Sequence, residues 1–256
     1  MASTLVLLAG RGESTNIIYN SLKEYFSIEK VVQEEPVPRV QFLKRRAKRL
    51  GVWKVFGQVL FQLLVVPYLQ RTSQARLREI KEKAGLNDAP IERSKLVKVK
   101  SINSDETMSI LRKIKPRIVV VSGTRIIANR ILSCIPAVFV NLHAGITPQY
   151  RGVHGAYWAL VEGRKSACGV TVHYVDSGID TGDILEQRII EPTPEDNFVT
   201  YPLLQLGVGV PLLKEAIENI LGNRAEVRAA PQGKSKLWTH PTLWEYLWYR
   251  ARYGVK

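Results

Sequence analysis

The sequence predicts an α/β fold built on a Rossmann-like, mostly parallel sheet. Short apolar runs at residues 4–9, 117–121 and 137–141 are typical of strands that are buried on both faces. Each run is followed by a glycine-bearing loop and then by a helical segment. Repeated strand–loop–helix units with buried strands indicate a doubly wound sheet that carries helices on both faces.

The first unit is a strand, a glycine loop and a helix that is expected to end near residue 25. Ser14 or Thr15 is expected to cap this helix. Free N–H groups at a helix N-terminus suit a phosphate, which nominates Gly12, Ser14 and Asn16 as substrate contacts. A plain strand-to-helix turn explains the same residues equally well.

The later elements continue the alternation. Further strands are expected at residues 28–33, 95–102, 168–174 and 185–190, and further helices at 103–115, 155–162 and 198–221. The segment 95–102 alternates basic and apolar residues, as an edge strand does.

Residues 36–85 read as a basic helical insertion that breaks near Gly51 and Pro67. Ten lysines and arginines, and no acidic residue, lie between Pro36 and Arg78. The formal net charge of the chain is +14, but without these ten residues only 27 basic side chains face 23 acidic ones. The basicity therefore belongs mainly to the insertion, and nucleic acid is not the expected partner.

Within the insertion, Lys54, Gln58 and Gln62 fall four apart in the apolar segment 52–66. This polar stripe and the short length argue against a transmembrane span. A lid over a substrate site stays open, as does a membrane-surface helix that makes a peripheral contact through the basic residues. The favoured interpretation is a helical insertion that packs on the sheet or across a homodimer interface.

The C-terminal tail alternates aromatic and basic residues. Its aromatic side chains are those of Trp238, Trp244, Tyr246, Trp248, Tyr249 and Tyr253. Such a pattern could stack on nucleic-acid bases or lie in a membrane interface. Packing of a C-terminal helix on the core, or on a dimer mate, is favoured.

Cysteine usage and the N-terminus predict a cytoplasmic location. Cys134 and Cys168 lie in apolar contexts without metal or redox spacing, as buried thiols in a reducing compartment do. The segment Met1–Ala9 has no basic region and too short an apolar run for a signal peptide, so we interpret it as the first strand.

Polar side chains gather after the strand at 137–141. Asn141 and His143 stand two apart, so in extended backbone both leave on one face, and Asp180 occupies a later glycine-bounded loop. An amide and a protonated imidazole could hydrogen-bond a developing oxyanion, while a carboxylate could support the imidazole and move a proton. Taken singly, each residue also has a structural explanation: the asparagine in a turn, the histidine in a loop and the aspartate as a cap.

The motif Asn-x-His at 141–143, then Pro-x-Tyr-Arg-Gly at 148–152, then Gly-Val-Thr-Val-His and Ile-Asp-Thr-Gly, resembles the folate-dependent formyltransferase family. That family includes glycinamide ribonucleotide, methionyl-tRNA and nucleotide-sugar formyltransferases. The resemblance implies that Asn141, His143 and Asp180 are catalytic, that 10-formyltetrahydrofolate is the formyl donor, and that no metal is required. His173 matches a family histidine, and a structural role is expected for it.

The same resemblance nominates the residues that bind ligands. It implies a pterin pocket lined by Arg125, Ile126, Ile127, Val175 and Asp176, and a substrate loop that contains Tyr150, Arg151 and Gly152. Two departures affect that loop, because family members usually have Ser and Leu where this chain has Gly145 and Thr147. The loop at Gly10–Asn16 is also looser than the compact glycine loop of glycinamide ribonucleotide formyltransferases.

The resemblance implies that residues 1–190 form a formyltransferase catalytic domain and that residues 191–256 add a C-terminal helix and an aromatic and basic extension. We expect formyl transfer to a primary amine of a phosphate-bearing small molecule, with a nucleotide-linked amino sugar favoured as acceptor. Glycinamide ribonucleotide is the alternative acceptor. Methionyl-tRNA is less favoured because only 66 residues follow Ile190, few for a separate RNA-binding barrel. A non-catalytic protein that binds nucleic acid or membranes is the rival from another class.

Overall fold

A computed structural model describes residues 4–229 and 235–256, and the first three residues and 230–234 lie outside the described part. The predicted first strand is therefore described from Thr4 onward, and the predicted tail is described on both sides of the second gap. Seven strands form one sheet, in the order β3-β2-β1-β4-β5-β7-β8. Two short strands, β6 and β9, pair separately.

Five strands of the large sheet are parallel. They are β1 (Thr4–Ala9), β2 (Ser27–Glu34), β3 (Leu96–Val99), β4 (Ile118–Ser122) and β5 (Val138–His143). Two strands run antiparallel to their neighbours, β7 (Gly169–Tyr174) beside β5 and β8 (Ile184–Ile189) beside β7. The predicted α/β class with a mostly parallel sheet is confirmed, and β3 lies at an edge as its alternating pattern indicated.

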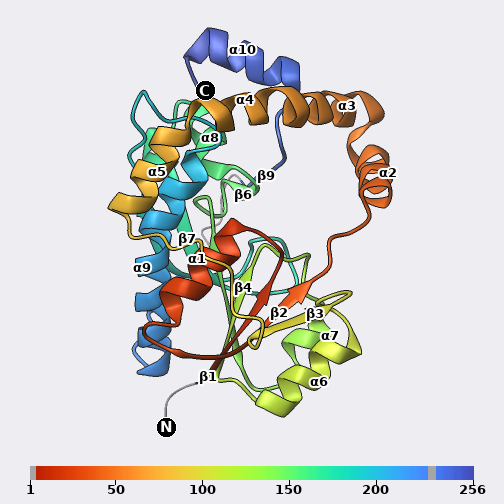
Figure 1. Ribbon diagram of the computed structural model, residues 1–256, viewed down its shortest axis with the longest axis vertical. Coiled ribbons are helices and arrows are strands. Elements are labelled where there is room, and N and C mark those ends of the chain that lie inside the picture. Colours follow the sequence, from red (N-terminus) through yellow and green to blue (C-terminus); the bar gives the residue numbers. More distant parts are fainter. Residues whose placement is uncertain (1–3, 230–234) are drawn as a thin grey trace.

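Helices cover both faces of this sheet (Figure 1). One face is covered by α1 (Glu13–Leu22), α5 (Gln74–Lys83) and α9 (Tyr201–Leu221), and the other by α6 (Asp105–Ile114) and α7 (Asn129–Leu132). Because side chains alternate along a strand, Leu5 and Leu7 of β1 join the first core while Val6 and Leu8 join the second. Burial on both faces explains the uninterrupted apolar runs of the sequence.

The helical insertion lies between β2 and β3. It comprises α2 (Arg39–Leu50), α3 (Val52–Leu60), a π-helical turn (Phe61–Val65), α4 (Val66–Thr72) and then α5. The predicted break at Gly51 is present, but the predicted break at Pro67 is wrong. A π-helical turn precedes Pro67, in which the N–H of Val66 donates to the carbonyl of Phe61, and the helix continues through the proline.

The helix from Val52 to Thr72 is therefore longer than the sequence indicated. Its 21 residues, with a mean hydropathy of 1.5, make it long and apolar enough to cross a membrane by length and composition alone. Only 28% of its apolar window is buried in the molecule. The short length of the apolar segment therefore no longer argues against a transmembrane span. The packing of the helix has to decide its role.

The polar stripe of this helix faces the protein, not solvent. Gln58 is 3% exposed, and its amide donates to the hydroxyl of Thr239 at 3.1 Å and to the carbonyl of His240 at 2.6 Å. Lys54 lies 3.8 Å from Glu245. The insertion therefore packs on the C-terminal segment, and the expectation that it packs on the sheet holds only for α5.

The C-terminal segment contains β9 (Leu237–Trp238), paired with β6 (Arg151–Gly152), and α10 (Leu243–Tyr253). Trp238 stacks on Trp158 of α8 (Gly155–Val161) at 4.5 Å, and Tyr246 is buried, so part of the predicted packing is confirmed. Trp244 and Trp248, in contrast, stay about half exposed. Of the two cysteines, Cys168 is buried, which raises the pKa of its thiol to about 12, whereas Cys134 is only partly buried.

Candidate active site

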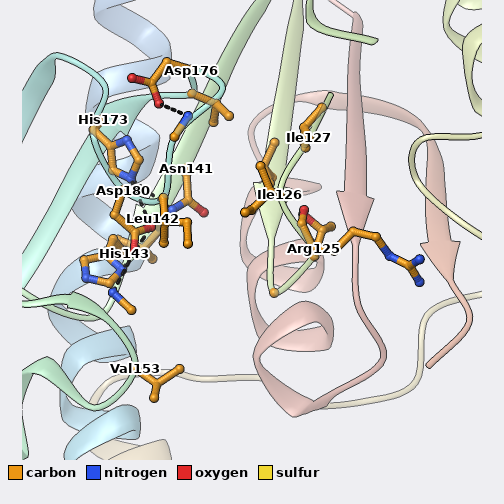
Figure 2. A pocket seen from close by; sticks show the side chains of 17 residues that line it. Arg125, Ile126, Ile127, Asn141, Leu142, His143, Val153, His173, Asp176 and Asp180 are labelled. Carbon is orange, nitrogen blue, oxygen red and sulfur yellow. Dashed lines mark hydrogen bonds and ion pairs between the residues drawn. The ribbon is translucent and has the colours of Figure 1, made fainter. Parts of the chain in front are cut away.

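A pocket of about 500 Å³ opens at the carboxyl ends of β4 and β5. Loops that follow these strands and the loop between β7 and β8 line it. Asn141, His143, His173 and Asp180 lie together on one wall, and Ile126 and Ile127 lie on the other (Figure 2). This is the edge of an open α/β sheet at which ligands are expected to bind.

Strand β5 carries Asn141 and His143 into this wall. In its antiparallel pairing with β7, Asn141 stands opposite His173 and His143 opposite Thr171. The side chains of His143 and His173 are 5% and 3% exposed. A rigid pair of strands therefore fixes both imidazoles and the amide.

His143 uses both ring nitrogens. Its Nε2 lies 2.7 Å from the carbonyl oxygen of Tyr150, and its Nδ1 lies 3.4 Å from Oδ1 of Asp180. Because a carbonyl only accepts, Nε2 carries a proton and Nδ1 is directed toward the carboxylate. A doubly protonated ring would donate to both oxygens.

Asp180 is held by the backbone around it. The backbone of Asp180 is left-handed, with φ of 51°, a conformation that aspartate tolerates better than most residues do. Its Oδ2 accepts the N–H of Gly152 at 2.8 Å, and its Oδ1 also lies 3.8 Å from Nε2 of His173. The carboxylate thus joins the loop after β7 to the loop before α8.

His173 orients Asn141, a role that the sequence did not reveal. Its Nδ1 donates to the carbonyl of Tyr174 at 2.7 Å, so its Nε2 accepts the amide N–H of Asn141 at 3.0 Å. Burial lowers the pKa of His173, with a further lowering from the nearby His143, so this neutral form persists at neutral pH. One amide hydrogen of Asn141 is used in this way, and the other stays available to a ligand. The signal for His173 in the sequence was its match to a histidine of the resembled family, for which a structural role was expected.

Gly145 permits the close contact between His143 and Tyr150. A Cβ on Gly145 would clash with the carbonyl oxygen of Tyr150 and would lie 2.8 Å from Nε2 of His143. Thr171 ties the same loop to β7, because its hydroxyl donates to the carbonyl of Gly145 at 2.8 Å. The glycine at a position where serine is usual in the resembled family therefore gives this loop a tighter path.

All five residues nominated for the pterin line the pocket, with Arg125, Ile126 and Ile127 across from the histidines and Asp176 beside His173 (Figure 2). Val175 is the fifth of them. The guanidinium of Arg125 points away from the histidines (Figure 2) and pairs with Glu34 at 2.6 Å, so only the rest of the residue faces the pocket. Asp176 closes a small turn by accepting the N–H of Gly178 at 3.0 Å.

Of the nominated substrate loop, only Gly152 lines the pocket. Tyr150 is 1% exposed and its hydroxyl donates to Glu162 at 2.8 Å, so its phenol belongs to the core and only its carbonyl serves the site. Arg151 extends to the carbonyl of Ile179 at 3.1 Å. The expectation that the side chain of Tyr150 contacts substrate needs this correction.

The nominated phosphate loop lies apart from the pocket. Helix α1 begins at Glu13 with Gly12 as its cap, so Ser14 and Thr15 do not cap it. The hydroxyl of Thr15 instead donates to the carbonyl of Gly10 at 2.8 Å. Gly12, Ser14 and Asn16 do not line the pocket, and the amide of Asn16 donates to the carbonyl of Asp88 at 3.1 Å.

Within residues 4–229 and 235–256, no group of three or more His, Cys, Asp or Glu side chains could hold a metal ion. The imidazoles of His143 and His173 point instead at carbonyl and amide groups.

The fold and the site together define a class, an α/β protein with an amide, two imidazoles and a carboxylate at the carboxyl edge of its sheet. A sequence model of the family described as "Formyl transferase" matches residues 64–202, more than half of the chain. The chain belongs to the formyl transferase family.

Curated relatives agree with this assignment. The methionyl-tRNA formyltransferase of Desulfotalea psychrophila is 32% identical over 143 residues, which cover 56% of this chain and 43% of that protein. The matched region thus spans less than half the length of that relative.

Solved structures share the fold at lower identity. The phosphoribosylglycinamide formyltransferase from Streptococcus pneumoniae TIGR4 superimposes with a TM-score of 0.55 at 20% identity, covering 86% of this chain and 99% of that one. The N-formyltransferase from Helicobacter canadensis, solved with folinic acid and dTDP-3-aminofucose, gives 0.54 at 17% identity, covering 93% and 71%. These likenesses establish a shared fold.

Proposed function

We propose that this protein transfers a formyl group from 10-formyltetrahydrofolate to a primary amine. The observation that carries the proposal is the convergence of Asn141, His143 and Asp180 in one pocket at the carboxyl edge of the sheet. Membership of the formyl transferase family supports the same reaction.

The pocket suits a flat, partly apolar donor. Ile126 is 51% exposed although it lines a concave site, and Val153 is 40% exposed on the same pocket. Apolar side chains that line an open pocket gain when a ring covers them. Arg125, Ile126, Ile127, Val175 and Asp176 would hold the pterin portion, and the bound donor would supply the formyl carbonyl.

Asn141 would stabilise the negative charge that develops on the carbonyl oxygen through a hydrogen bond, and a charged His143, whose two ring nitrogens face Tyr150 and Asp180, would stabilise it through its positive charge. His173 fixes the amide of Asn141 so that its second N–H is free to donate. Donors that are held in place before the reaction stabilise such charge without reorganising.

Asp180 would support the charged imidazole and take up the proton that the amine loses. Its Oδ1 faces Nδ1 of His143, and the N–H of Gly152 holds its Oδ2. A positioned carboxylate that removes a proton contributes about 10²–10⁴-fold to a rate.

A nucleotide-linked amino sugar is the acceptor that we favour. A protein of the same fold was solved with dTDP-3-aminofucose. Glycinamide ribonucleotide is less favoured because the loop at Gly12 carries Glu13 and lies beside Lys81, whose charge Glu13 and Asp88 already balance. A phosphate would meet little uncompensated positive charge there.

Methionyl-tRNA is the second candidate, and one observation favours it. The curated relatives that match this chain at about one-third identity are methionyl-tRNA formyltransferases. The many basic residues of the insertion would suit a polyanion.

The test is a formyl-transfer assay with 10-formyltetrahydrofolate and a panel of amino-sugar nucleotides, glycinamide ribonucleotide and methionyl-tRNA. Release of tetrahydrofolate that requires one acceptor identifies the substrate. Asn141→Ala and His143→Ala should abolish that release, whereas Asp183→Asn, in the same loop as Asp180 but outside the pocket, should retain it. Release that survives both alanine variants, or no release with any acceptor, would refute the proposal.

A further inference from the structure

One end of the molecule exposes far more apolar surface than the rest. Among the described residues, thirteen of the nineteen large hydrophobic side chains that are exposed belong to α2, to the helix from Val52 to Thr72, or to α10. Helix α10 lies along α3 and α4 at one end of the long axis, and α2 descends beside them (Figure 1). We call this surface, made by α2, α3, α4 and α10, the apolar end face.

The apolar side chains of the end face form helical stripes that point outward. Trp53, Phe56, Leu63 and Leu64 lie on the outer side of one helix, and Trp53 is 78% exposed. The spacing of these residues follows helical turns, so they belong to one face. In an ordinary surface helix the apolar face is buried, but in this helix the polar stripe is buried against the protein and the apolar side chains are exposed.

Helix α10 adds a second stripe beside the first. Trp244, Leu247 and Trp248 are about half exposed and stand three and four residues apart, on one face of the helix. The two helices can approach closely because Gly57 has no side chain, and a Cβ there would clash with the ring of Trp244. The two stripes therefore lie on helices that contact each other, and together they expose more apolar surface than scattered single residues would.

Positive charge gathers on the α2 part of this surface. Helix α2 has no buried residue and no acidic residue in its first turn, and its basic side chains are Arg39, Lys44, Arg45, Arg46, Lys48 and Arg49. Within the described parts of the chain, only Arg46 among these six has a side-chain hydrogen-bond partner, Gln58 at 2.9 Å, and none of the six forms an ion pair. The α2 charges are thus available to an anionic partner.

We propose that the apolar end face docks on the surface of an anionic lipid bilayer. Helices α3, α4 and α10 lie in the interface plane with Trp53, Phe56 and Trp248 among the acyl chains, while the lysines and arginines of α2 meet lipid phosphates. Apolar and aromatic side chains flanked by basic ones are the chemistry that membrane-surface helices use. An anionic bilayer both neutralises the positive charge of the face and removes its apolar stripes from water.

Other occupants fit these observations less well. A second copy of the chain, related by a two-fold axis, would bring two uncompensated α2 helices toward each other, and like charges oppose that contact. A nucleic acid would satisfy the charge, but Leu63, Leu64 and Leu247 have no ring to stack on bases. Crossing the bilayer would strip Gln58 of its bonds to Thr239 and His240 and leave a polar stripe in lipid.

Vesicle sedimentation tests the proposal on the full chain. The protein is mixed with vesicles of phosphatidylcholine alone, or with about one-third phosphatidylglycerol, and we expect binding to the anionic vesicles only. Replacing Lys44, Arg45, Lys48 and Arg49 by Gln should weaken partitioning at least a hundredfold, because each basic residue near such a surface contributes about fivefold. The triple variant Trp53→Ser, Phe56→Ser, Leu64→Ser should also lose binding.

Matched controls separate docking from general stickiness. Tyr25→Ser with Ile189→Ser removes exposed apolar residues elsewhere, and Lys98→Gln with Lys100→Gln removes exposed charges on and beside β3; both should bind as the unaltered protein does. Tryptophan fluorescence gives a second measurement. Brominated lipids should quench the exposed Trp53, Trp244 and Trp248 but not the buried Trp158 and Trp238.

Four results would overturn the proposal. The first two are absence of binding to anionic vesicles at low salt, and loss of binding in the control variants as large as in the test variants. The other two are a stable dimer in light scattering that the triple variant abolishes, and tRNA that displaces the protein from vesicles at a lower concentration than the vesicle lipid. Circular dichroism of each variant verifies its fold, and quenching of the unaltered protein tests the docking without any variant. Formyl-transfer activity enters none of these measurements, so the outcome is independent of the proposed reaction.

Discussion

Nδ1 of His143 lies 3.4 Å from Oδ1 of Asp180, although the two residues are 37 positions apart in the chain. The N–H of Gly152 holds the other oxygen of that carboxylate, and the carbonyl of Tyr150 holds the other nitrogen of that imidazole. Loops that follow β5 and β7 therefore meet at these two residues. Any change in either loop should reach the imidazole.

Asp180→Asn should remove most of the proposed activity while leaving the fold. An amide keeps the size of the carboxylate but neither supports a charged His143 nor accepts a proton, so we expect kcat to fall by about 10²–10⁴-fold. Steady-state formyl transfer measures the loss, and Asp183→Asn is the matched control because that residue lies outside the pocket. Equal activities of the two variants would show that Asp180 has no part in proton transfer.

Gly145→Ala should lower kcat through its methyl group alone. That group would meet the carbonyl of Tyr150 and Nε2 of His143, so one of them must move, and a shift of about 1 Å in a catalytic group can cost about 100-fold. Gly12→Ala is the steric control, because its methyl would meet only the hydroxyl of Ser14, at 3.9 Å. A kcat that Gly145→Ala leaves unchanged would mean that the imidazole does not depend on this close contact.

The sequence was a good guide to the sheet and to the part of the site that lies on it. The first strand was predicted and is described from Thr4 to Ala9, because a parallel strand buried on both faces leaves an uninterrupted apolar run. Asn141 and His143 could be placed together for the same local reason, since side chains two apart in a strand share a face. The loop that delivers Asp180 could be found only through resemblance.

Long-range packing was beyond the sequence. Gln58 and Gln62 have the spacing of a solvent-exposed helix face, but they are hydrogen-bonded to Thr239 and His240, which lie about 180 residues later in the chain. Tyr150 likewise carried a polar group in a polar motif, yet its ring is buried and its hydroxyl donates to Glu162. In both cases a partner outside the local sequence pattern decides whether the polar side chain is buried.

Arg76 should be essential to the stability of the loop before α9. Its guanidinium pairs with Asp196 through two bonds of 2.9 Å, and the side chain of Asp196 is 0% exposed. Burial alone would raise the pKa of Asp196, but the bonds from Arg76 and from Thr193 together outweigh it and the net effect is a lowering. Arg76→Leu leaves a buried carboxylate without its cation and should cost about 3–5 kcal/mol in urea unfolding.

A second substitution distinguishes the ion pair from simple packing. Arg76→Leu combined with Asp196→Leu removes both charges, so most of the lost free energy of unfolding should return. The exposed pair of Lys83 and Glu79 is the control, since breaking it should cost less than about 1 kcal/mol. A double variant as unstable as Arg76→Leu alone would assign the loss to packing instead of charge.

The contact between the insertion and the C-terminal segment should weaken in acid. His154 and His240 touch at 3.0 Å, with Gln62 donating to Nδ1 of His240 and Arg46 nearby. Burial, and then the charge of Arg46, lowers the pKa of His240 to about 4, and burial lowers that of His154 well below its ordinary value. The unfolded chain therefore binds more protons than the folded one below pH 6.5.

His240 should thus contribute stability that is complete above pH 6.5 and is lost as the pH falls toward 4. The slope is about 1.4 kcal/mol for each pH unit in that window, with His154 adding to it in the same direction. Urea unfolding at pH 7.5 and pH 5 measures the loss, and His240→Gln, which cannot titrate, should show a smaller difference between the two. Because carboxylates titrate alike in both proteins, the comparison isolates the imidazole. Identical pH dependence in the two proteins would mean that His240 is already accessible to protons in the folded state.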